Sequence, residues 1–195
     1  MKKLLAISIM LTVSLANAAS KLDEGLDSLK KKDYVVAIEI LEPLAISGNN
    51  TAQYLLGDLF TIKGTEVEDY EKGVRFYKLA AHGGNEIAQH DLGVLYSNGE
   101  GVLQDFSEAV KWYKLAAAHG FAPSQNNLGN MYFNGRGVAQ DYVKAHMWLN
   151  LSASTGFNSD WVNNRNEVAK KMTARQIAEA QKLARECLAR KYKGC

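Results

Sequence analysis

The sequence predicts an all-α solenoid built from helix-turn-helix repeats. The 36-residue segment 88–123 reads AQHDLGVLYSNGEGVLQDFSEAVKWYKLAAAHGFAP; a second copy follows directly and a rougher copy precedes it. A repeat with a period of roughly 20–50 residues indicates stacked supersecondary units. Within each copy, apolar residues recur at helical spacing and glycines separate the helical segments. These two patterns together predict the fold class.

Each full repeat contains two predicted helices. In the central copy the first helix has one apolar face, formed by Ala88, Leu92, Leu95 and Tyr96. Gly93 lies on that face, where glycine costs about 0.5–1 kcal/mol relative to alanine. We therefore expect the partner helix to approach closely at Gly93. The second helix carries a stripe of aromatic and small residues, namely Phe106, Ala109, Trp112, Tyr113 and Ala116.

The loop between the two helices carries its own signals. Gly99 is expected to end the first helix in the left-handed conformation. Asp105 is expected to cap the second helix, with Glu108 three residues later as in a capping box. Asp69 and Asp141 repeat this cap one period before and one period after.

Residues 1–18 are predicted to be a secretory signal peptide. Lys2 and Lys3 precede an apolar run at 4–15, and 16–18 reads Ala-Asn-Ala, a typical cleavage pattern. The run is shorter than the roughly 20 residues needed to span a bilayer, so no stable membrane insertion is expected. The mature chain would start at Ala19 and be exported, either periplasmic or secreted.

The remaining chain divides into five predicted segments. Residues 19–50 form a degenerate N-terminal repeat, 51–86, 87–122 and 123–158 form full repeats, and 159–195 form C-terminal capping helices. In the last segment the period breaks, and Thr173 and Gln176 form a capping box that opens a helix. A solenoid needs such a terminal element with a polar outer face.

The formal net charge of +2 hides an uneven distribution. Residues 19–164 hold 12 basic and 18 acidic side chains, whereas 165–195 hold 9 basic and 3 acidic ones. A basic tail sometimes indicates a nucleic-acid partner. Here the positive charges are spread around a helix that also carries glutamates, which favours a solvated cap. Together with export, this argues against nucleic acid.

The positions shared between repeats resemble the Sel1-like repeat family, a tetratricopeptide-like group. The central copy carries the match at Ala88, Leu92, Gly93, Tyr96, Gly99, Gly101, Val102, Gln104, Asp105, Ala109, Trp112, Ala116 and Gly120. The copy at 51–85 departs from the pattern, with Lys63 and Thr65 in place of glycines and Phe76 in place of tryptophan. The resemblance implies a right-handed α-solenoid that acts as a binding scaffold for a protein or peptide, with no shared catalytic residues.

By resemblance to tetratricopeptide geometry, the first helix of each repeat lines a concave groove. Residues beside the packing stripe of these helices are then expected to contact the partner: Tyr54, Asp58, Thr61, His90, Val94, Ser97, Asn126, Asn130 and Phe133. The set is rich in amides, hydroxyls and aromatic rings and holds a single carboxylate. Such a surface favours an extended peptide over a strongly charged ligand, which would need an arginine cluster.

Signals for chemistry are weak. The glycine loops lack the preceding strand of a phosphate-binding loop. Ser28 and Lys31 match the S-x-x-K spelling of penicillin-recognising enzymes, but no companion motif follows. The four histidines and two cysteines lack zinc spacing, so neither metal nor cofactor is expected. Trp112 and Trp148 fall on the buried stripe, which favours core packing over sugar stacking.

Two alternative functions stay open. One is a hydrolase acting on cell-wall material or a β-lactam, and the other is a secreted effector that acts on a host.

Cys187 and Cys195 are predicted to form a disulfide, because export would place them in an oxidising compartment. A continuous helix would hold their Cα atoms about 12 Å apart, whereas a disulfide needs roughly 4.4–6.8 Å. The helix should therefore end near Arg190, and Gly194 should help the chain turn back. Closing such a short loop with a disulfide should raise the free energy of unfolding by roughly 2–3 kcal/mol in the chain-entropy model. An intermolecular bond through Cys195 is the alternative.

Overall fold

The computed structural model describes residues 17–156 and 158–195, and every regular element in these ranges is an α-helix. This confirms the predicted all-α class. The predicted signal peptide lies outside the described residues, apart from Asn17 and Ala18. No helix in the described ranges combines the length and the apolar character needed to cross a bilayer.

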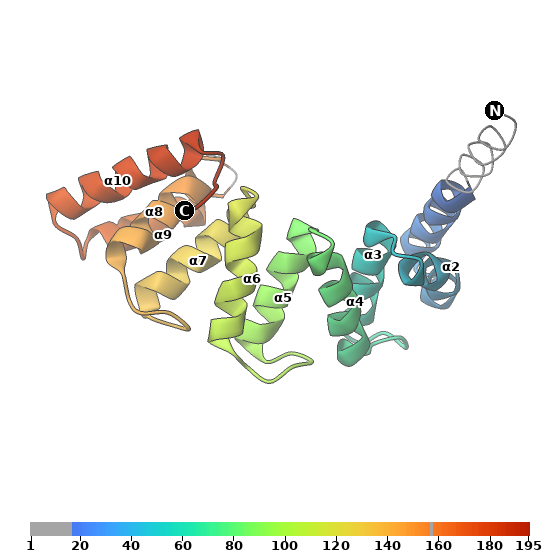
Figure 1. Cartoon of the computed structure of the whole chain (residues 1–195). Coiled ribbons are helices and arrows are strands. Elements are labelled where there is room, and N and C mark those ends of the chain that lie inside the picture. Colours follow the sequence, from blue (N-terminus) through green and yellow to red (C-terminus); the bar gives the residue numbers. More distant parts are fainter. Residues whose placement is uncertain (1–16, 157) are drawn as a thin grey trace, which may run out of the picture. The chain divides into compact units, whose positions relative to one another are not determined.

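Helical hairpins follow one another along the chain (Figure 1). Residues 17–30 are helical and form the first arm of the degenerate repeat. The helices that follow are α2 (Tyr34–Ile46), α3 (Asn50–Phe60), α4 (Tyr70–His82), α5 (Glu86–Asn98), α6 (Phe106–Ala118), α7 (Ala122–Asn134), α8 (Tyr142–Ala153), α9 (Ser159–Ala169) and α10 (Ala174–Ala189).

The second helix of each full repeat begins at the predicted aspartate cap. Asp69 and Asp141 each accept a hydrogen bond from the backbone N–H three residues later, at 3.0 Å and 2.9 Å. Asp105 accepts two, from Ser107 and Glu108. The Glu108 side chain pairs with Lys111 at 2.7 Å. The caps satisfy N–H groups that a helix start would otherwise leave without partners.

All three interhelical loops close with the same backbone bond. The N–H of the capping aspartate donates to the backbone carbonyl of an aromatic residue near the end of the preceding helix, so the Asp105 N–H donates to the Tyr96 carbonyl at 2.9 Å. The equivalent bonds join Asp69 to Phe60 at 2.8 Å and Asp141 to Tyr132 at 3.0 Å. The loop at 61–69 therefore closes like the others, although it lacks the repeated glycines.

Close helix packing explains the recurring glycine of the first helices. A Cβ placed on Gly93 would collide with the ring of Tyr113 on α6, and one on Gly57 would collide with Tyr77 on α4. The expectation of close approach at this position is confirmed. The third full repeat replaces the tyrosine with Leu149, which contacts Gly129 in the same way.

The chain divides into two compact units, Met1–Gly83 and Gly84–Cys195. The core of the first unit joins α2, α3 and α4 through Leu41, Leu56, Leu59, Phe60 and Phe76. The second unit has a larger core of its own, which draws on α6, α7, α8, α9 and α10. Each unit therefore buries its own apolar stripes.

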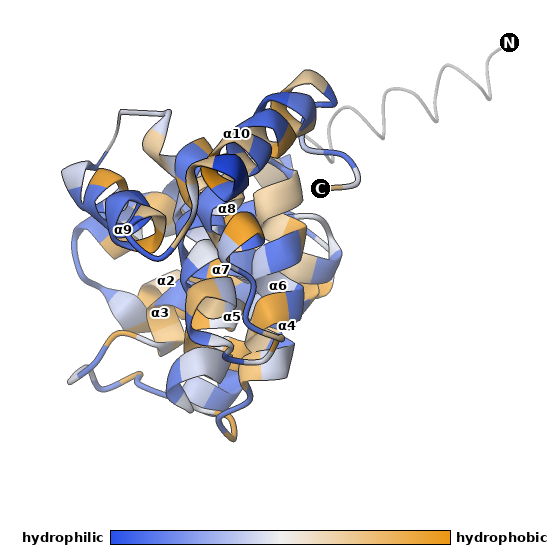
Figure 2. Ribbon diagram, turned by 90° about the vertical axis from the view of Figure 1, so that its left-hand side faces the viewer, coloured by the Kyte–Doolittle hydropathy of each residue, from blue (hydrophilic) through white to orange (hydrophobic). Residues whose placement is uncertain are grey.

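The last two helices cover the end of the second unit. α9 packs against α7 and α8, and α10 packs against α8. Ala180, Ala184 and Cys187 form the buried stripe of α10, which Figure 2 shows as a largely hydrophilic helix with a few apolar positions. Thr173 and Gln176 form the predicted capping box. This arrangement fits a terminal cap.

The chain turns back after α10 and closes a disulfide between Cys187 and Cys195. Their Cα atoms lie 5.6 Å apart. α10 ends at Ala189, with Arg190 as its C-cap, and Gly194 adopts a left-handed φ of 68°. The helix end and the glycine turn lie where the spacing of the two cysteines predicts them.

Candidate functional site

The predicted binding residues of the first full repeat surround Tyr77. The ring of Tyr54 lies 6.0 Å from the ring of Tyr77, centroid to centroid. The Tyr77 hydroxyl donates to Asp58 Oδ1 at 3.3 Å and lies 3.4 Å from Thr61 Oγ1. Desolvation raises the pKa of Asp58 above its ordinary value, and the hydrogen bond from Tyr77 opposes that shift. Asp58 nevertheless keeps contact with solvent.

The equivalent residues of the second full repeat surround Tyr113. His90 lies with its ring 5.7 Å from Tyr113 and 5.3 Å from Phe121, and its Nδ1 shares a 2.9 Å hydrogen bond with Ser124 Oγ. Desolvation lowers the pKa of His90 to about 4, so the imidazole is neutral at pH 7. Burial raises the pKa of Tyr113 to about 12, against hydrogen bonds with Asn127 and Ser97. Val94 is half-buried against the core.

The third full repeat presents fewer of its predicted residues. Asn126 is buried and accepts a hydrogen bond from Asn164 of α9 at 3.0 Å. Phe133 packs with its ring 5.7 Å from that of Tyr142. Asn130 is half-buried. Asn126 is thus occupied by the cap, a contact that the repeat pattern did not predict because α9 lies outside the repeats.

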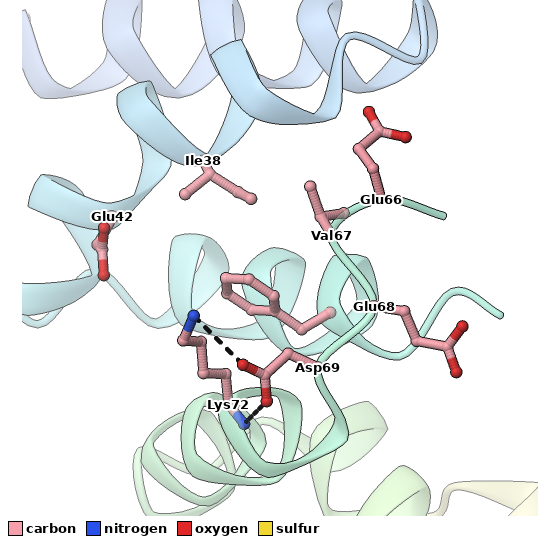
Figure 3. A pocket seen from close by; sticks show the side chains of 8 residues that line it. Ile38, Glu42, Glu66, Val67, Glu68, Asp69 and Lys72 are labelled. Atoms are coloured by element: carbon pink, nitrogen blue, oxygen red, sulfur yellow. Dashed lines mark hydrogen bonds and ion pairs between the residues drawn. The ribbon is translucent and has the colours of Figure 1, made fainter. Parts of the chain in front are cut away.

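Figure 3 shows a pocket of about 310 Å³ in the first unit. Phe60 of α3 lines it. Ile38 and Glu42 of α2 and Glu66 and Val67 of the 61–69 loop, which Figure 3 labels, also line it. Lys72 of α4 pairs with Asp69 at 3.2 Å and places its ammonium group 5.4 Å from the Phe60 ring centroid. We call this the first-unit pocket.

A pocket of about 430 Å³ occupies the equivalent place in the second unit. Lys114 of α6, Tyr132 of α7 and Lys144 of α8 follow Glu42, Phe60 and Lys72 by two repeat periods. Trp148 of α8 also lines it, together with Tyr192, Gly194 and Cys195 of the tail after α10. We call this the second-unit pocket. Neither pocket was predicted, because each combines residues from three helices. The first adds a loop that departs from the repeated glycine pattern, and the second adds the tail that follows α10.

The residues considered for chemistry do not assemble into a reactive group. Ser28 donates its hydroxyl to the Glu24 carbonyl at 3.1 Å within its own helix. Desolvation and the nearby Arg165 lower the pKa of buried His146. In the described part of the chain, no three His, Cys, Asp or Glu side chains converge as a metal site. Trp112, Trp148 and Trp161 are all buried.

Comparison with known proteins agrees with this architecture. The Sel1 repeat family model matches residues 50–85, 87–121 and 122–157. The Sel1 repeat protein from Oxalobacter formigenes has a similar structure, with a TM-score of 0.59 and 34% identity over 67% of this chain and 97% of that one. A search of curated proteins found no match.

A second similar structure is a protective antigen present in uropathogenic Escherichia coli strains, which displays an SLR fold. Its TM-score is 0.62 at 25% identity, over 92% of this chain. This chain spans about half of that protein, 48% of its length. The two structures have the α-solenoid of stacked Sel1 repeats in common with this chain. The three matched repeats cover more than half of the sequence, and the chain belongs to the Sel1 repeat family.

Proposed function

We propose that this protein is an exported, non-catalytic scaffold that binds a protein or peptide through the first helices of its repeats. The observation that carries the proposal is the run of three Sel1 repeats, because repeats of this kind generally serve as protein-interaction scaffolds. Solenoid repeats present extended surfaces that suit such partners. We call the exposed or half-buried residues Tyr54, Asp58, Thr61, His90, Val94, Ser97 and Asn130 the first-helix surface.

The chemistry of the first-helix surface favours an extended, weakly charged segment. Asp58 is its one carboxylate, and His90 is neutral at pH 7. Hydroxyl and amide groups at Thr61, Ser97 and Asn130 can pair with a peptide backbone. Tyr54 is half-buried and can supply an aromatic contact. Asn126 and Phe133 already contact other parts of the protein, so they are secondary members of the set.

Export is part of the same proposal. The basic start, apolar run and Ala-Asn-Ala pattern of residues 1–18 support it. The disulfide between Cys187 and Cys195 is compatible with an oxidising compartment. Fractionation of cells expressing the full sequence distinguishes the periplasm from the medium. Recovery of the uncleaved chain in the cytosol would contradict export.

Site-specific crosslinking tests the binding surface. A photoreactive amino acid is placed at Tyr54, Val94 or Asn130, and at exposed Leu79 and Leu115 on second helices as matched controls. The same envelope protein should crosslink from the first-helix positions and not from the two leucine positions. Crosslinking confined to the leucine positions would contradict the assignment.

The captured partner then allows a quantitative check. Tyr54→Ala and Asn130→Ala should each weaken its binding by about fivefold or more, as expected of an anchoring contact. Leu115→Ala should leave the affinity unchanged. Normal binding by both first-helix variants would place the contact elsewhere on the protein.

A further inference from the structure

One face of α8 differs from the equivalent faces of the earlier helices, because the cap covers it. Leu151 is 4% exposed, whereas Leu79 and Leu115, which occupy the same position in the two preceding repeats, are 44% and 48% exposed. Met147 is buried one turn earlier on this face, where α6 carries the exposed Lys111. The face has therefore become more apolar in the repeat that the cap covers.

His146 departs from this trend. The preceding copies have Ile38, Val74 and Val110 at the equivalent position. Val74 and Val110 are buried, and His146 is buried as well, with an exposed fraction of 3%. Its Nδ1 atom has no hydrogen-bond partner among the described residues, and a buried polar atom of this kind carries a desolvation cost that valine avoids. The last copy thus has a titratable side chain where packing alone favours an aliphatic one.

The charge that acts on His146 comes from α9. Desolvation lowers the pKa of His146, and repulsion by Arg165 of α9 lowers it further. α7 has no acidic, basic or histidine side chain, and Lys144 on α8 itself is exposed. Asp160 and Glu167 of α9 are exposed, and so are all the charged side chains of α10. Within the described residues, no buried carboxylate therefore compensates a proton on His146.

α9 is held in place by few contacts. It packs against α8 and, to a smaller extent, against α7. Only two of its side chains, Trp161 and Val168, are buried. The amide of Asn164 adds one polar contact to Asn126 of α7 at 3.0 Å. Segments with few buried apolar contacts open locally at a lower cost in free energy than the core does. Local opening of the second unit is therefore expected at α9.

We propose that His146 makes the docking of α9 a pH-sensitive latch, which opens as the medium becomes acidic. When α9 is released, the imidazole meets water and is separated from Arg165, so its pKa returns to about 6.5. The docked state takes up this proton only at a lower pH, so acid favours the released state. Between pH 7.5 and 5.5, uptake of one proton raises the opening equilibrium by up to about tenfold.

Release of α9 would extend the first-helix surface. Asn164 then no longer occupies Asn126, so the amide of Asn126 becomes available one helical turn before Asn130. This consequence for partner binding rests on the proposed function, whereas the latch itself does not. Chemical labelling of α9 needs no partner, so the latch and the proposed function fail independently.

Thiol labelling of Val168→Cys in the oxidised protein measures the opening of α9. Val168 is 1% exposed, so a methanethiosulfonate reagent reaches the introduced thiol only when α9 is released. Asn163→Cys, at an exposed position of the same helix, corrects for the pH dependence of thiol reactivity. The labelling rate of Val168→Cys relative to Asn163→Cys should rise several-fold, up to about tenfold, from pH 7.5 to 5.5. A ratio that stays constant over this range would overturn the proposal.

Histidine variants test whether His146 is the group that titrates. His146→Val introduces the residue found at Val110 in the preceding repeat and should remove the pH dependence of the labelling ratio. His119→Gln changes an exposed histidine of the same unit and should leave the pH dependence intact. Equal pH dependence in His146→Val and in the protein without this change would assign the opening to another group and overturn the proposal.

A buried position outside α9 separates local release from unfolding of the whole unit. Val110→Cys makes the same substitution as Val168→Cys, at a site on α6 that is 3% exposed. Both are measured in the His90→Gln background, which removes the other buried histidine whose low pKa destabilises this unit in acid. Val110→Cys should stay protected at pH 5.5 while Val168→Cys gains labelling. An equal gain at both positions would show that the unit unfolds as a whole and would overturn the latch.

Discussion

Gly93 and Tyr113 show how a single pair of residues sets the distance between two helices. The glycine lets α5 approach the ring of Tyr113, which is buried and also contacts His90. The same tyrosine position therefore supports both the packing of the hairpin and the first-helix surface. The close approach of the Tyr113 ring explains why α5 tolerates glycine at position 93 despite its poor helix propensity.

Gly93→Ala should destabilise the second unit by about 1–2 kcal/mol, because overpacking costs more than the helix gains from alanine. Chemical denaturation followed by circular dichroism measures the change. The Tyr113→Ala background removes the ring, and there the cost of Gly93→Ala should largely disappear. An equal cost in both backgrounds would show that the ring is not the obstacle.

His90 should make the stability of the second unit depend on pH. Its pKa is about 4 in the folded protein and about 6.5 when unfolded, so the unfolded chain binds more protons between these values. Stability is complete above pH 6.5 and declines as the pH falls toward 4, by up to about 3 kcal/mol. Denaturation at pH 7.5, 6 and 5 measures the decline.

His90→Gln should remove most of this decline while His146, whose pKa is also lowered, keeps a part of it. His119→Gln is the control, since His119 is exposed at the C-cap of α6. A pH profile of His90→Gln that matches the wild type would mean that His90 does not titrate between the two states as stated.

At the scale of elements, α9 connects the last repeat to the cap through a polar contact. Asn164 Nδ2 donates to Asn126 Oδ1 at 3.0 Å, and Asn126 is buried. Such a bond matters because a buried polar group without its partner carries the full cost of desolvation. Asn126 therefore differs from the other predicted partner-binding residues, which are exposed or half-buried.

Asn164→Ala should lower the stability of the second unit by about 1–2 kcal/mol, since it leaves the Asn126 carbonyl oxygen without this donor. Asn163→Ala changes the exposed neighbour on the same helix and should have little effect. Thermal unfolding of the two variants makes the comparison. Equal stability of Asn164→Ala and Asn163→Ala would show that the amide pair does not hold α9 in place.

At the scale of the whole molecule, each unit has its own core. The core cluster of the second unit joins buried residues from α6, α7, α8, α9 and α10, and the unit carries the disulfide. In repeat proteins, stability is approximately a sum of local terms from each repeat and its neighbours. A separate fragment with enough repeats and a cap can therefore be stable.

Residues 84–195 expressed alone should fold into a helical, cooperatively unfolding domain. Its amide resonances in α7, α8 and α10 should match those of the full chain. Circular dichroism and ¹⁵N correlation spectra provide the measurement. A fragment without cooperative unfolding would show that its core requires the first unit.

The sequence by itself determined the helical class, the position of the aspartate caps, the tight glycine contacts and the short disulfide loop. These features depend on local chemistry or on spacing that repeats along the chain. Asp105 caps α6 through hydrogen bonds to its immediate neighbours. A glycine recurs at the position of Gly93 because the two helices of each hairpin approach each other closely there. The repeating pattern of the sequence therefore predicts these features directly.

Only the tertiary structure decided which predicted binding residues are available and where the pockets lie. Asn126 meets Asn164 from a helix outside the repeat, and His90 becomes neutral because Tyr113, Phe121 and Ser124 enclose it. The second-unit pocket needs three helices and the returning tail. Contacts of this kind join residues far apart in the sequence, and their burial and charge exist only once the chain has packed.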